Sequence, residues 1–192
     1  MPPKVKVTQE QIVKAGLELA RQAGPEAINA RAVAAKLGCS TQPVFSNYAS
    51  MEALQADVLA AAEAFYQEHM AAAQREGRFP PYKAMGLGYI HFAQQEPALF
   101  RWLYMRDRSW ETLPDGRAEN APVLDLIAEK TGLDRDAAWL FHLEMWMFVH
   151  GLATTLATGY VDWDEALVSD MLTDVFQGLK ARFQSKERDV NE

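Results

Sequence analysis

Residues 29–47 read NARAVAAKLGCSTQPVFSN, and this stretch decides the fold that the sequence predicts. Asn29 can cap a helix over Ala30–Leu37, because its side chain can accept a bond from a free N–H of the first turn. Gly38 suits the left-handed position after a helix end. A second short helix then fits Thr41–Asn47. Two short helices joined by a tight turn that contains glycine are typical of a helix-turn-helix, whose second helix enters the major groove of DNA.

The second of these helices carries polar residues that can bind DNA. Ser40 is expected to cap it. Gln42 and Asn47 can bond the edge of adenine in a bidentate way, and Thr41 and Ser46 can bond bases or phosphates. The alternative is an ordinary helical hairpin with polar outer residues, and the spacing alone leaves both interpretations open.

Helical periodicity dominates the rest of the chain, and strand signals are nearly absent. In Gln9–Ala23 the apolar positions follow helical spacing, with Thr8 as N-cap and Gly24-Pro25 as the stop. We expect further helices at Ser50–Glu76, Tyr82–Gln95, Pro97–Arg106, Pro122–Lys130, Asp134–Thr158 and Asp164–Gln184. Ser109–Ala121 is predicted to be a loop, and Ser185–Glu192 a frayed tail. The predicted fold class is therefore all-α, with about nine helices.

The composition is that of an ordinary globular protein: 49% of the 192 residues are apolar and 23% are charged. No apolar run approaches the roughly 18 residues needed to span a bilayer, and the N-terminus has no apolar segment typical of a secretory signal. Cys39 is the only cysteine, which excludes a disulfide framework and a cysteine-rich zinc site. We therefore expect a cytoplasmic protein with no membrane partner.

Charge is distributed unevenly along the chain. The net charge is −7, but residues 1–50 hold six basic and three acidic residues, a net of +3, whereas the remainder holds 13 basic and 23 acidic residues. A basic head on an acidic body suits a protein that contacts a polyanion at one end only. We expect a DNA-binding domain at residues 1–52 and a second domain at residues 53–192.

A longer run of sequence carries a family resemblance. Residues 12–21 read IVKAGLELAR, residues 28–34 read INARAVA, and residues 37–40, 44–48 and 50–54 read LGCS, VFSNY and SMEAL. Together they resemble the DNA-binding domain of TetR-family transcriptional regulators. The resemblance implies a homodimer that binds a near-palindromic double-stranded DNA operator, acts as a repressor and is released by a small, largely apolar effector. The segment WMFVHGL at 146–152 also resembles a Trp/His-Gly signature of one subgroup's regulatory domain.

The resemblance also implies which residues contact DNA. Phe45 lies where the family often has a Tyr that bonds a phosphate, Asn47 where it often has His, and Met51 where it often has a phosphate-binding Lys. Val44 and Tyr48 are available to pack inward. The predicted DNA-binding residues are Lys4, Lys6, Arg31, Lys36, Ser40, Thr41, Gln42, Phe45, Ser46, Asn47 and Tyr48.

The second domain is rich in aromatic residues and methionine, which form either a core or a hydrophobic effector cavity. The resemblance implies such a cavity. His142, Trp146 and His150 recur at four-residue steps and share a broad helix face, and with His91 they are the best polar set for orienting a ligand. The alternative is a pair of core histidines with satisfied hydrogen bonds. The predicted ligand-binding residues are Phe65, Tyr66, Tyr89, Phe92, Phe100, Tyr104, Met105, Trp110, Trp139, His142, Met145, Trp146 and His150.

The last two predicted helices have features of a dimer interface. An apolar stripe with four-residue spacing runs through Leu167, Met171, Val175, Leu179 and Phe183. Small residues that allow close helix approach are Gly151, Thr155, Thr158 and Gly178. The resemblance implies a four-helix dimer interface, for which we expect Gly151, Thr155, Leu167, Met171, Val175, Gly178 and Leu179. The alternative is a helix pair internal to one chain.

Sequence motifs of catalysis are absent: the chain has no Gly-x-Ser-x-Gly, Walker A, Gly-x-Gly-x-x-Gly or His-Glu-x-x-His pattern. We therefore predict no enzymatic activity, no cofactor and no metal site. One alternative is a DNA-binding regulator whose body binds a protein partner instead of a small molecule. A helical enzyme with an accidental helix-turn-helix is much less favoured.

Overall fold

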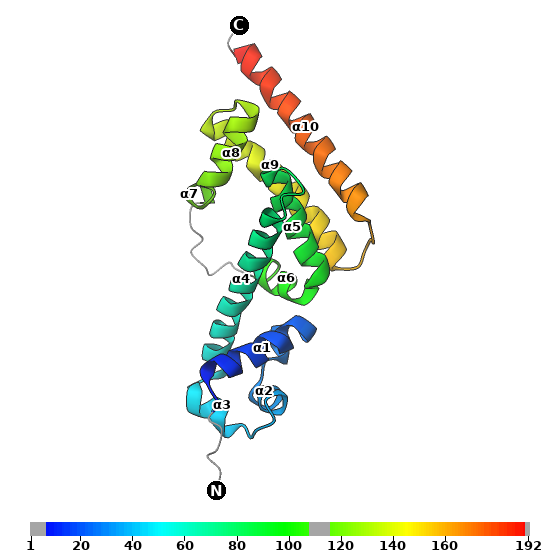
Figure 1. The fold of residues 1–192 in the computed structure, drawn as a ribbon. Coiled ribbons are helices and arrows are strands. Elements are labelled where there is room, and N and C mark those ends of the chain that lie inside the picture. Colours follow the sequence, from blue (N-terminus) through cyan, green and yellow to red (C-terminus); the bar gives the residue numbers. More distant parts are fainter. Residues whose placement is uncertain (1–6, 108–115, 191–192) are drawn as a thin grey trace. The chain divides into compact units, whose positions relative to one another are not determined.

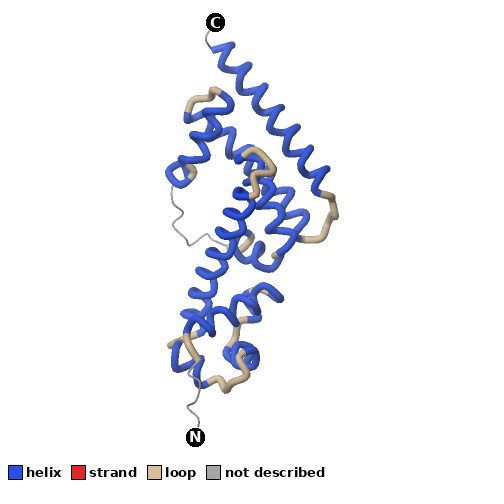
Figure 2. Tube along the Cα trace, viewed as in Figure 1, coloured by secondary structure: helices blue, strands red, loops and turns tan. Residues whose placement is uncertain are grey.

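The computed structural model describes residues 7–107 and 116–190, and within them it is all-α, as predicted, with no strand (Figures 1 and 2). A single turn of 3₁₀-helix covers Pro25–Ala27. The α-helices are α1 (Gln9–Ala23), α2 (Ala30–Lys36), α3 (Gln42–Asn47), α4 (Met51–Arg75), α5 (Pro81–Gln95), α6 (Pro97–Tyr104), α7 (Gly116–Glu119), α8 (Ala121–Thr131), α9 (Arg135–Ala157) and α10 (Glu165–Val190). None of the helices in this part of the chain is both long and apolar enough to span a membrane.

The chain forms two compact units. One comprises Met1–His69 with Gln95–Arg106, and the other comprises Met70–Gln94 with Asp107–Glu192. The first unit therefore includes α6, because α6 packs against α1. The sequence analysis divided the chain by function, into a DNA-binding domain at residues 1–52 and a second domain at residues 53–192. That division stays a prediction.

The first unit is a small helical domain with its own core. Its large, fully buried side chains are Ile12, Val33, Val44, Leu54, Val58, Leu99 and Phe100. Helix α1 approaches α4 closely at Gly16, where an added Cβ would lie 2.6 Å from Cγ2 of Val58. A glycine at this position is therefore a packing requirement, since any side chain would push the two helices apart.

The turn between α2 and α3 has the geometry that the sequence predicts. Asn29 accepts a bond from the N–H of Ala32 at 3.0 Å and so caps α2. Gly38 has φ +65°, and the N–H groups of Gly38 and Cys39 bond back to carbonyls of α2 at 3.1 and 3.0 Å. This pair of bonds is the Schellman motif that ends helices at a left-handed glycine. The predicted cap of α3 was wrong by one residue, because α3 begins after Thr41, not after Ser40.

Two predicted boundaries in the second unit differ from the structure. The predicted loop at Ser109–Ala121 contains the single-turn helix α7, and residues 108–115 lie outside the described residues. The predicted tail after Gln184 is instead helical to Val190. This extension contains lysine, glutamate and arginine, which favour helix where no packing opposes it.

The second unit contains α5, α8, α9, α10, the short α7 and the last turns of α4. Phe141 on α9 is fully buried, and its ring centre lies 5.3 and 5.8 Å from those of Phe176 and Phe183 on α10. Phe183 therefore packs inward and does not continue the predicted outward stripe of α10. A four-residue step advances 40° beyond a full turn, so a stripe that starts at Leu167 has rotated by about 160° after sixteen residues.

Candidate functional site

The outward face of α3 is the candidate DNA-contact surface. Gln42, Phe45 and Ser46 are exposed there, and we call these three residues the α3 face. Phe45 is 60% exposed, which is unusual for a phenylalanine in a small domain. Val44 faces the opposite way and is buried. The helix therefore presents an amide, an aromatic ring and a hydroxyl to the outside.

Other polar residues of α3 are bonded within the chain. The Ser46 hydroxyl donates to the backbone carbonyl of Gln42 at 2.9 Å. The Asn47 amide donates to the carbonyls of Pro43 at 2.7 Å and of Val7 at 3.4 Å. These bonds occupy the donors of Ser46 and Asn47, whereas the side chain of Gln42 remains exposed.

Tyr48, at the end of α3, is buried. Its hydroxyl donates to Oδ2 of Asp57 at 2.8 Å. Burial and the Asp57 carboxylate raise the pKa of Tyr48 to about 12, so the phenol stays protonated and keeps this bond. The placement of Tyr48 favours the inward packing that the sequence left open beside DNA contact.

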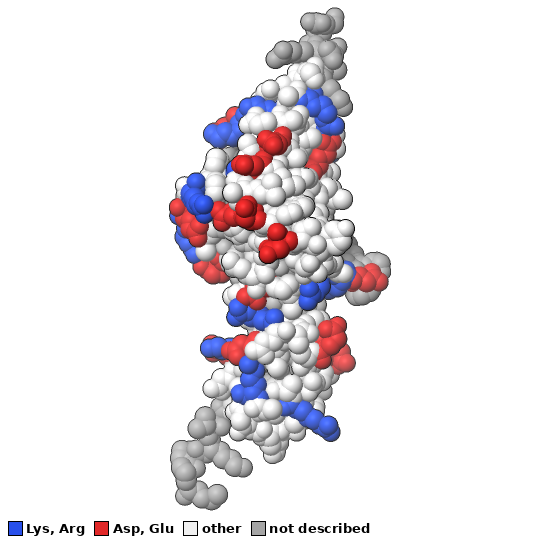
Figure 3. Space-filling model, turned by 90° about the vertical axis from the view of Figure 1, so that its right-hand side faces the viewer, with Lys and Arg blue, Asp and Glu red and all other residues white. Residues whose placement is uncertain are grey.

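Helix α2 of the first unit carries two basic side chains, Arg31 and Lys36. Arg31 on α2 is exposed, and the ammonium of Lys36 lies 2.9 Å from a carboxylate oxygen of Glu18. The Lys36 charge lowers the pKa of Glu18. In the view of Figure 3 the lowest charged side chains of the first unit are basic. The predicted arm residues Lys4 and Lys6 lie outside the described residues.

The predicted ligand-binding residues are divided between the two units, and their role stays a prediction. Phe65, Tyr66, Phe100, Tyr104 and Met105 belong to the first unit, whereas Tyr89, Phe92, Trp139, His142, Met145, Trp146 and His150 belong to the second. Trp110 lies outside the described residues.

Within the second unit, Trp139, His142, Trp146 and His150 lie along one side of α9, and we call them the α9 stripe. Nδ1 of His142 lies 3.1 Å from the Tyr82 hydroxyl, and Nδ1 of His150 lies 2.9 Å from the Tyr89 hydroxyl. Trp146 stacks on His150 with 5.1 Å between ring centres and an interplanar angle of 12°. The sequence analysis missed Tyr82, although its seven-residue spacing from Tyr89 places both tyrosines on one face of α5.

Both tyrosine–histidine pairs are uncharged. Burial lowers the pKa of His142 and of His150, and burial raises the pKa of Tyr82. Each tyrosine hydroxyl can donate to Nδ1 of its histidine or accept from it, depending on which ring nitrogen carries the proton. The histidines of the α9 stripe are thus satisfied on one ring nitrogen by side chains of α5.

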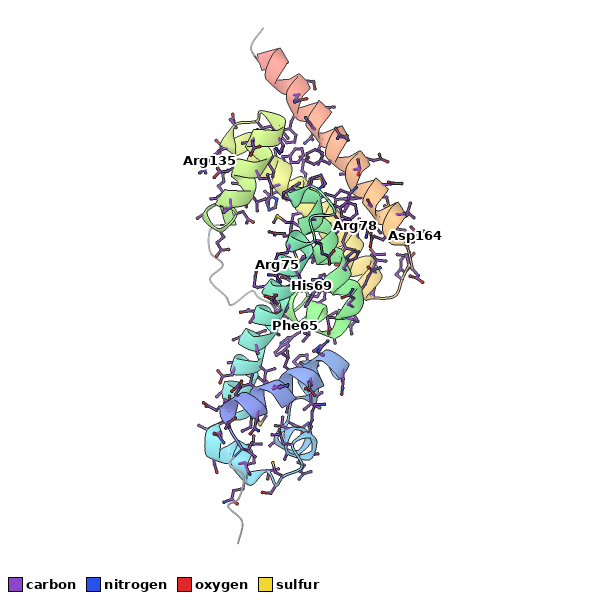
Figure 4. The ribbon with its side chains drawn as sticks, in the orientation of Figure 1. Phe65, His69, Arg75, Arg78, Arg135 and Asp164 are labelled. Carbon is purple, nitrogen blue, oxygen red and sulfur yellow. The ribbon has the colours of Figure 1, made fainter. Side chains whose placement is uncertain are left out.

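The third predicted histidine lies apart from this stripe. Nε2 of His91 lies 3.5 Å from a carboxylate oxygen of Glu165 at the start of α10, and the other oxygen of Glu165 lies 2.7 Å from Arg78. Figure 4 labels Arg78 near the start of α10. His91 therefore lies beside the Arg78–Glu165 ion pair at the start of α10, and sequence spacing contained no signal for this contact.

Aromatic residues of the first unit pack among themselves. Tyr66 meets Tyr104 edge to face at 5.4 Å between ring centres, and Phe100 is fully buried. The guanidinium of Arg21 on α1 lies over the ring of Phe65, which Figure 4 labels on α4, at 4.7 Å from the ring centre. Arg21 also bonds both carboxylate oxygens of Glu96. These contacts join α1, α4 and α6 within the unit.

The region that identifies the chain covers much of the second unit together with α6 of the first unit. A family model described as the tetracyclin repressor-like C-terminal domain matches residues 82–177, half of the chain. The chain belongs to the TetR family. No curated protein matches it. The α9 stripe and the first half of α10 lie inside the matched region of this TetR-family chain.

Of the predicted dimer residues of this TetR-family chain, Gly151, Leu167 and Gly178 are exposed, and Thr155, Met171, Val175 and Leu179 are half-buried. Met147 on α9 is 61% exposed and Leu167 on α10 is 45% exposed. Gly151 lies on the same side of α9 as Met147, and Gly178 lies on the same side of α10 as Leu167. An added Cβ at either glycine would meet no atom within 4 Å. We call the exposed surface of Leu140, Met147, Gly151, Leu167 and Gly178 the outer α9–α10 face. Leu140 and Met147 were missed, because the sequence analysis considered only the small residues of α9.

Proposed function

We propose that this TetR-family protein is a ligand-responsive transcriptional repressor that binds a near-palindromic operator as a homodimer. The observation that carries the proposal is the exposed α3 face, held after a Schellman turn in a helix-turn-helix. Each α3 enters one major groove, and the two half-sites lie about one helical turn apart. Lys and Arg of the first unit add a sequence-independent attraction to phosphates.

The outer α9–α10 face supports the homodimer part of the proposal. Its exposed apolar side chains alternate with glycines that leave open space, so helices of a second copy can approach closely. A symmetric pair of α9 and α10 helices would bury Met147 and Leu167 of both copies. Burial of such side chains removes apolar area from water and stabilises association.

The α9 stripe supports the effector part of the proposal. Because the histidine pairs are neutral, the stripe favours a flat, largely apolar molecule over an ion. Trp146 is 41% exposed and offers a ring face for stacking. An effector acts on the operator only if it binds one arrangement of the protein better than another, since equal affinity shifts nothing.

DNA selection tests the operator part. Genomic fragments that bind the purified protein should share a near-palindromic site, and affinity for that site should fall steeply with rising salt. Arg31→Ala should weaken binding to operator and scrambled duplexes alike, because phosphate contacts carry no sequence information. Failure to enrich any duplex, or affinity that does not change with salt, would contradict the proposal.

Thermal unfolding tests the effector part. In a panel of uncharged aromatic molecules, a binder present at about one hundred times its Kd should stabilise the protein by about 2.7 kcal/mol. Trp146→Ala should remove this response, whereas Trp163→Ala, which alters a tryptophan outside the α9 stripe, should retain it. A panel without any hit, combined with a protein partner that releases the operator, would favour the alternative of a protein-binding body.

A further inference from the structure

The exposed ring of Phe45 is the feature of the first unit that phosphate contacts do not explain. Among the described residues 7–69, Phe45 is the only large apolar side chain in the exposed class. Exposing a phenylalanine to water brings no stability to the folded chain. The ring is therefore available to an outside partner, and its exposed neighbours on α3 are the polar residues Gln42 and Ser46.

The other residues of α3 indicate which polar group is available to that partner beside the ring. Ser46 and Asn47 have committed their donors to backbone carbonyls within 2.7 to 3.4 Å. Gln42 is exposed and lies three residues before Phe45, so the two side chains are neighbours on one side of the helix. The α3 face thus presents one uncommitted amide beside one aromatic ring.

These two groups match a particular pair of base edges in the major groove. A glutamine amide can bond N6 and N7 of adenine together, and a phenylalanine ring can contact the 5-methyl group of thymine. The donors and acceptors of a G·C pair would instead lose water against the ring without gaining partners, which is costly. The combination of Gln42 and Phe45 therefore favours A·T pairs.

We propose that Phe45 reads a thymine methyl group and that Gln42 reads an adenine beside it, so that each operator half-site has A·T pairs under α3. This inference rests on the proposed function, because it presupposes that α3 enters the major groove. It assigns specificity to an apolar contact, which is distinct from a phosphate contact because a phosphate is present at every sequence.

Replacement of thymine by deoxyuridine tests the inference, because it removes the 5-methyl group and leaves base pairing unchanged. Thymines of the selected operator are replaced one at a time, and Kd is measured by fluorescence anisotropy with the full-length protein. At one thymine of each half-site, the replacement should weaken wild-type binding about fourfold, the value expected for one buried methyl group. Replacement in both half-sites together should weaken binding about fifteenfold.

Variants of the protein show whether Phe45 is the residue that senses the methyl group. Phe45→Ala should bind the thymine and deoxyuridine operators equally, because the contact is gone from both. Ser46→Ala, the matched control on the same helix face, should retain the fourfold difference. Both side chains are exposed, so neither variant should change the melting temperature by more than about 2 °C.

The outcomes separate this inference from the proposed function. If Phe45→Ala still discriminates deoxyuridine from thymine at the same position, another residue reads the methyl group and the inference is wrong, although operator binding stands. Equal weakening of operator and scrambled duplexes by Phe45→Ala, without any deoxyuridine effect, would place the ring on the DNA backbone and also overturn it. If the wild-type protein enriches no duplex, the proposed function itself fails.

Discussion

The α3 face and the α9 stripe are both helix surfaces that combine aromatic with polar residues, but they use their polar groups differently. The amide of Gln42 is exposed on the α3 face, whereas His142 and His150 of the α9 stripe each bond a tyrosine of α5. A surface whose polar groups are exposed can exchange water for a polar partner. A surface whose polar groups are already bonded recognises a partner mainly through shape and apolar contact.

The largest expected effect concerns the neighbouring side of α9, where the outer α9–α10 face is apolar and exposed. Met147→Asp should place an unpaired carboxylate in the proposed dimer interface, at about 2 kcal/mol for each copy. Symmetry doubles the cost, so the dimer Kd should rise about a thousandfold in sedimentation experiments. Because Met147 is 61% exposed in the single chain, the fold itself should survive.

Two further variants test whether the effect of Met147→Asp is specific to the outer α9–α10 face. Gln177→Asp adds a carboxylate on α10 away from the outer face and should leave the dimer intact. Gly151→Leu should raise the helical stability of the single chain, since glycine is a poor helix former, yet it should weaken the dimer by filling the open space. A dimer that tolerates both Met147→Asp and Gly151→Leu would require a different interface.

The next largest effect should destabilise the first unit and leave the second unit folded. Gly16→Leu places a side chain where Cγ2 of Val58 lies 2.6 Å from the added Cβ, so α1 and α4 must separate. Overpacking of this kind costs about 3 kcal/mol. Operator binding should be lost, and amide hydrogen exchange should accelerate in α1–α3 while α9 keeps its protection. Equal acceleration in both units would mean that they unfold as one.

The features that the sequence predicted well are those that depend on residues close together in the chain. The caps at Thr8 and Asn29 and the left-handed Gly38 each depend on bonds that span five residues or fewer. Backbone geometry and one side chain decide such features, so sequence spacing is sufficient. The helix-turn-helix was predictable for this reason, whereas the family model covers residues 82–177, beyond this motif.

Contacts between distant residues account for what the sequence missed. Tyr82 lies 60 residues before His142, and Glu96 lies 75 residues after Arg21. Helical periodicity indicates which side of a helix is apolar, but it contains no information about which helix that side meets. The sequence analysis therefore identified the α9 stripe correctly as a shared face and left its partners in α5 open.

A smaller effect should show whether the tyrosine–histidine pairs are structural. Tyr82→Phe removes the hydroxyl that bonds Nδ1 of His142. The loss of one partly buried hydrogen bond should destabilise the protein by about 1–2 kcal/mol in denaturant unfolding. Tyr160→Phe, which removes a hydroxyl from a residue that is 83% exposed, is the matched control and should have almost no effect. Unchanged stability in Tyr82→Phe would indicate that the pair is kept for a ligand.

The smallest expected effect is a pH dependence of stability that comes from the same histidines. Burial lowers the pKa of His142 and of His150 below the ordinary value of 6.5. Below about pH 6.5 the unfolded chain therefore binds protons that the folded chain does not, so stability is complete above that pH and falls as the solution becomes more acidic. Both rings are only partly buried, and solvent screening keeps the effect small.

Thermal unfolding between pH 7.5 and 5.5 measures this dependence before most carboxylates titrate. The double variant H142N/H150N should lose less stability on acidification than the wild-type protein, and NMR titration of the wild-type imidazoles should place both midpoints below 6.5. If the two proteins lose stability equally across this range, the histidines are not held neutral by burial. The α9 stripe would then be able to carry charge, and its contrast with the α3 face would disappear.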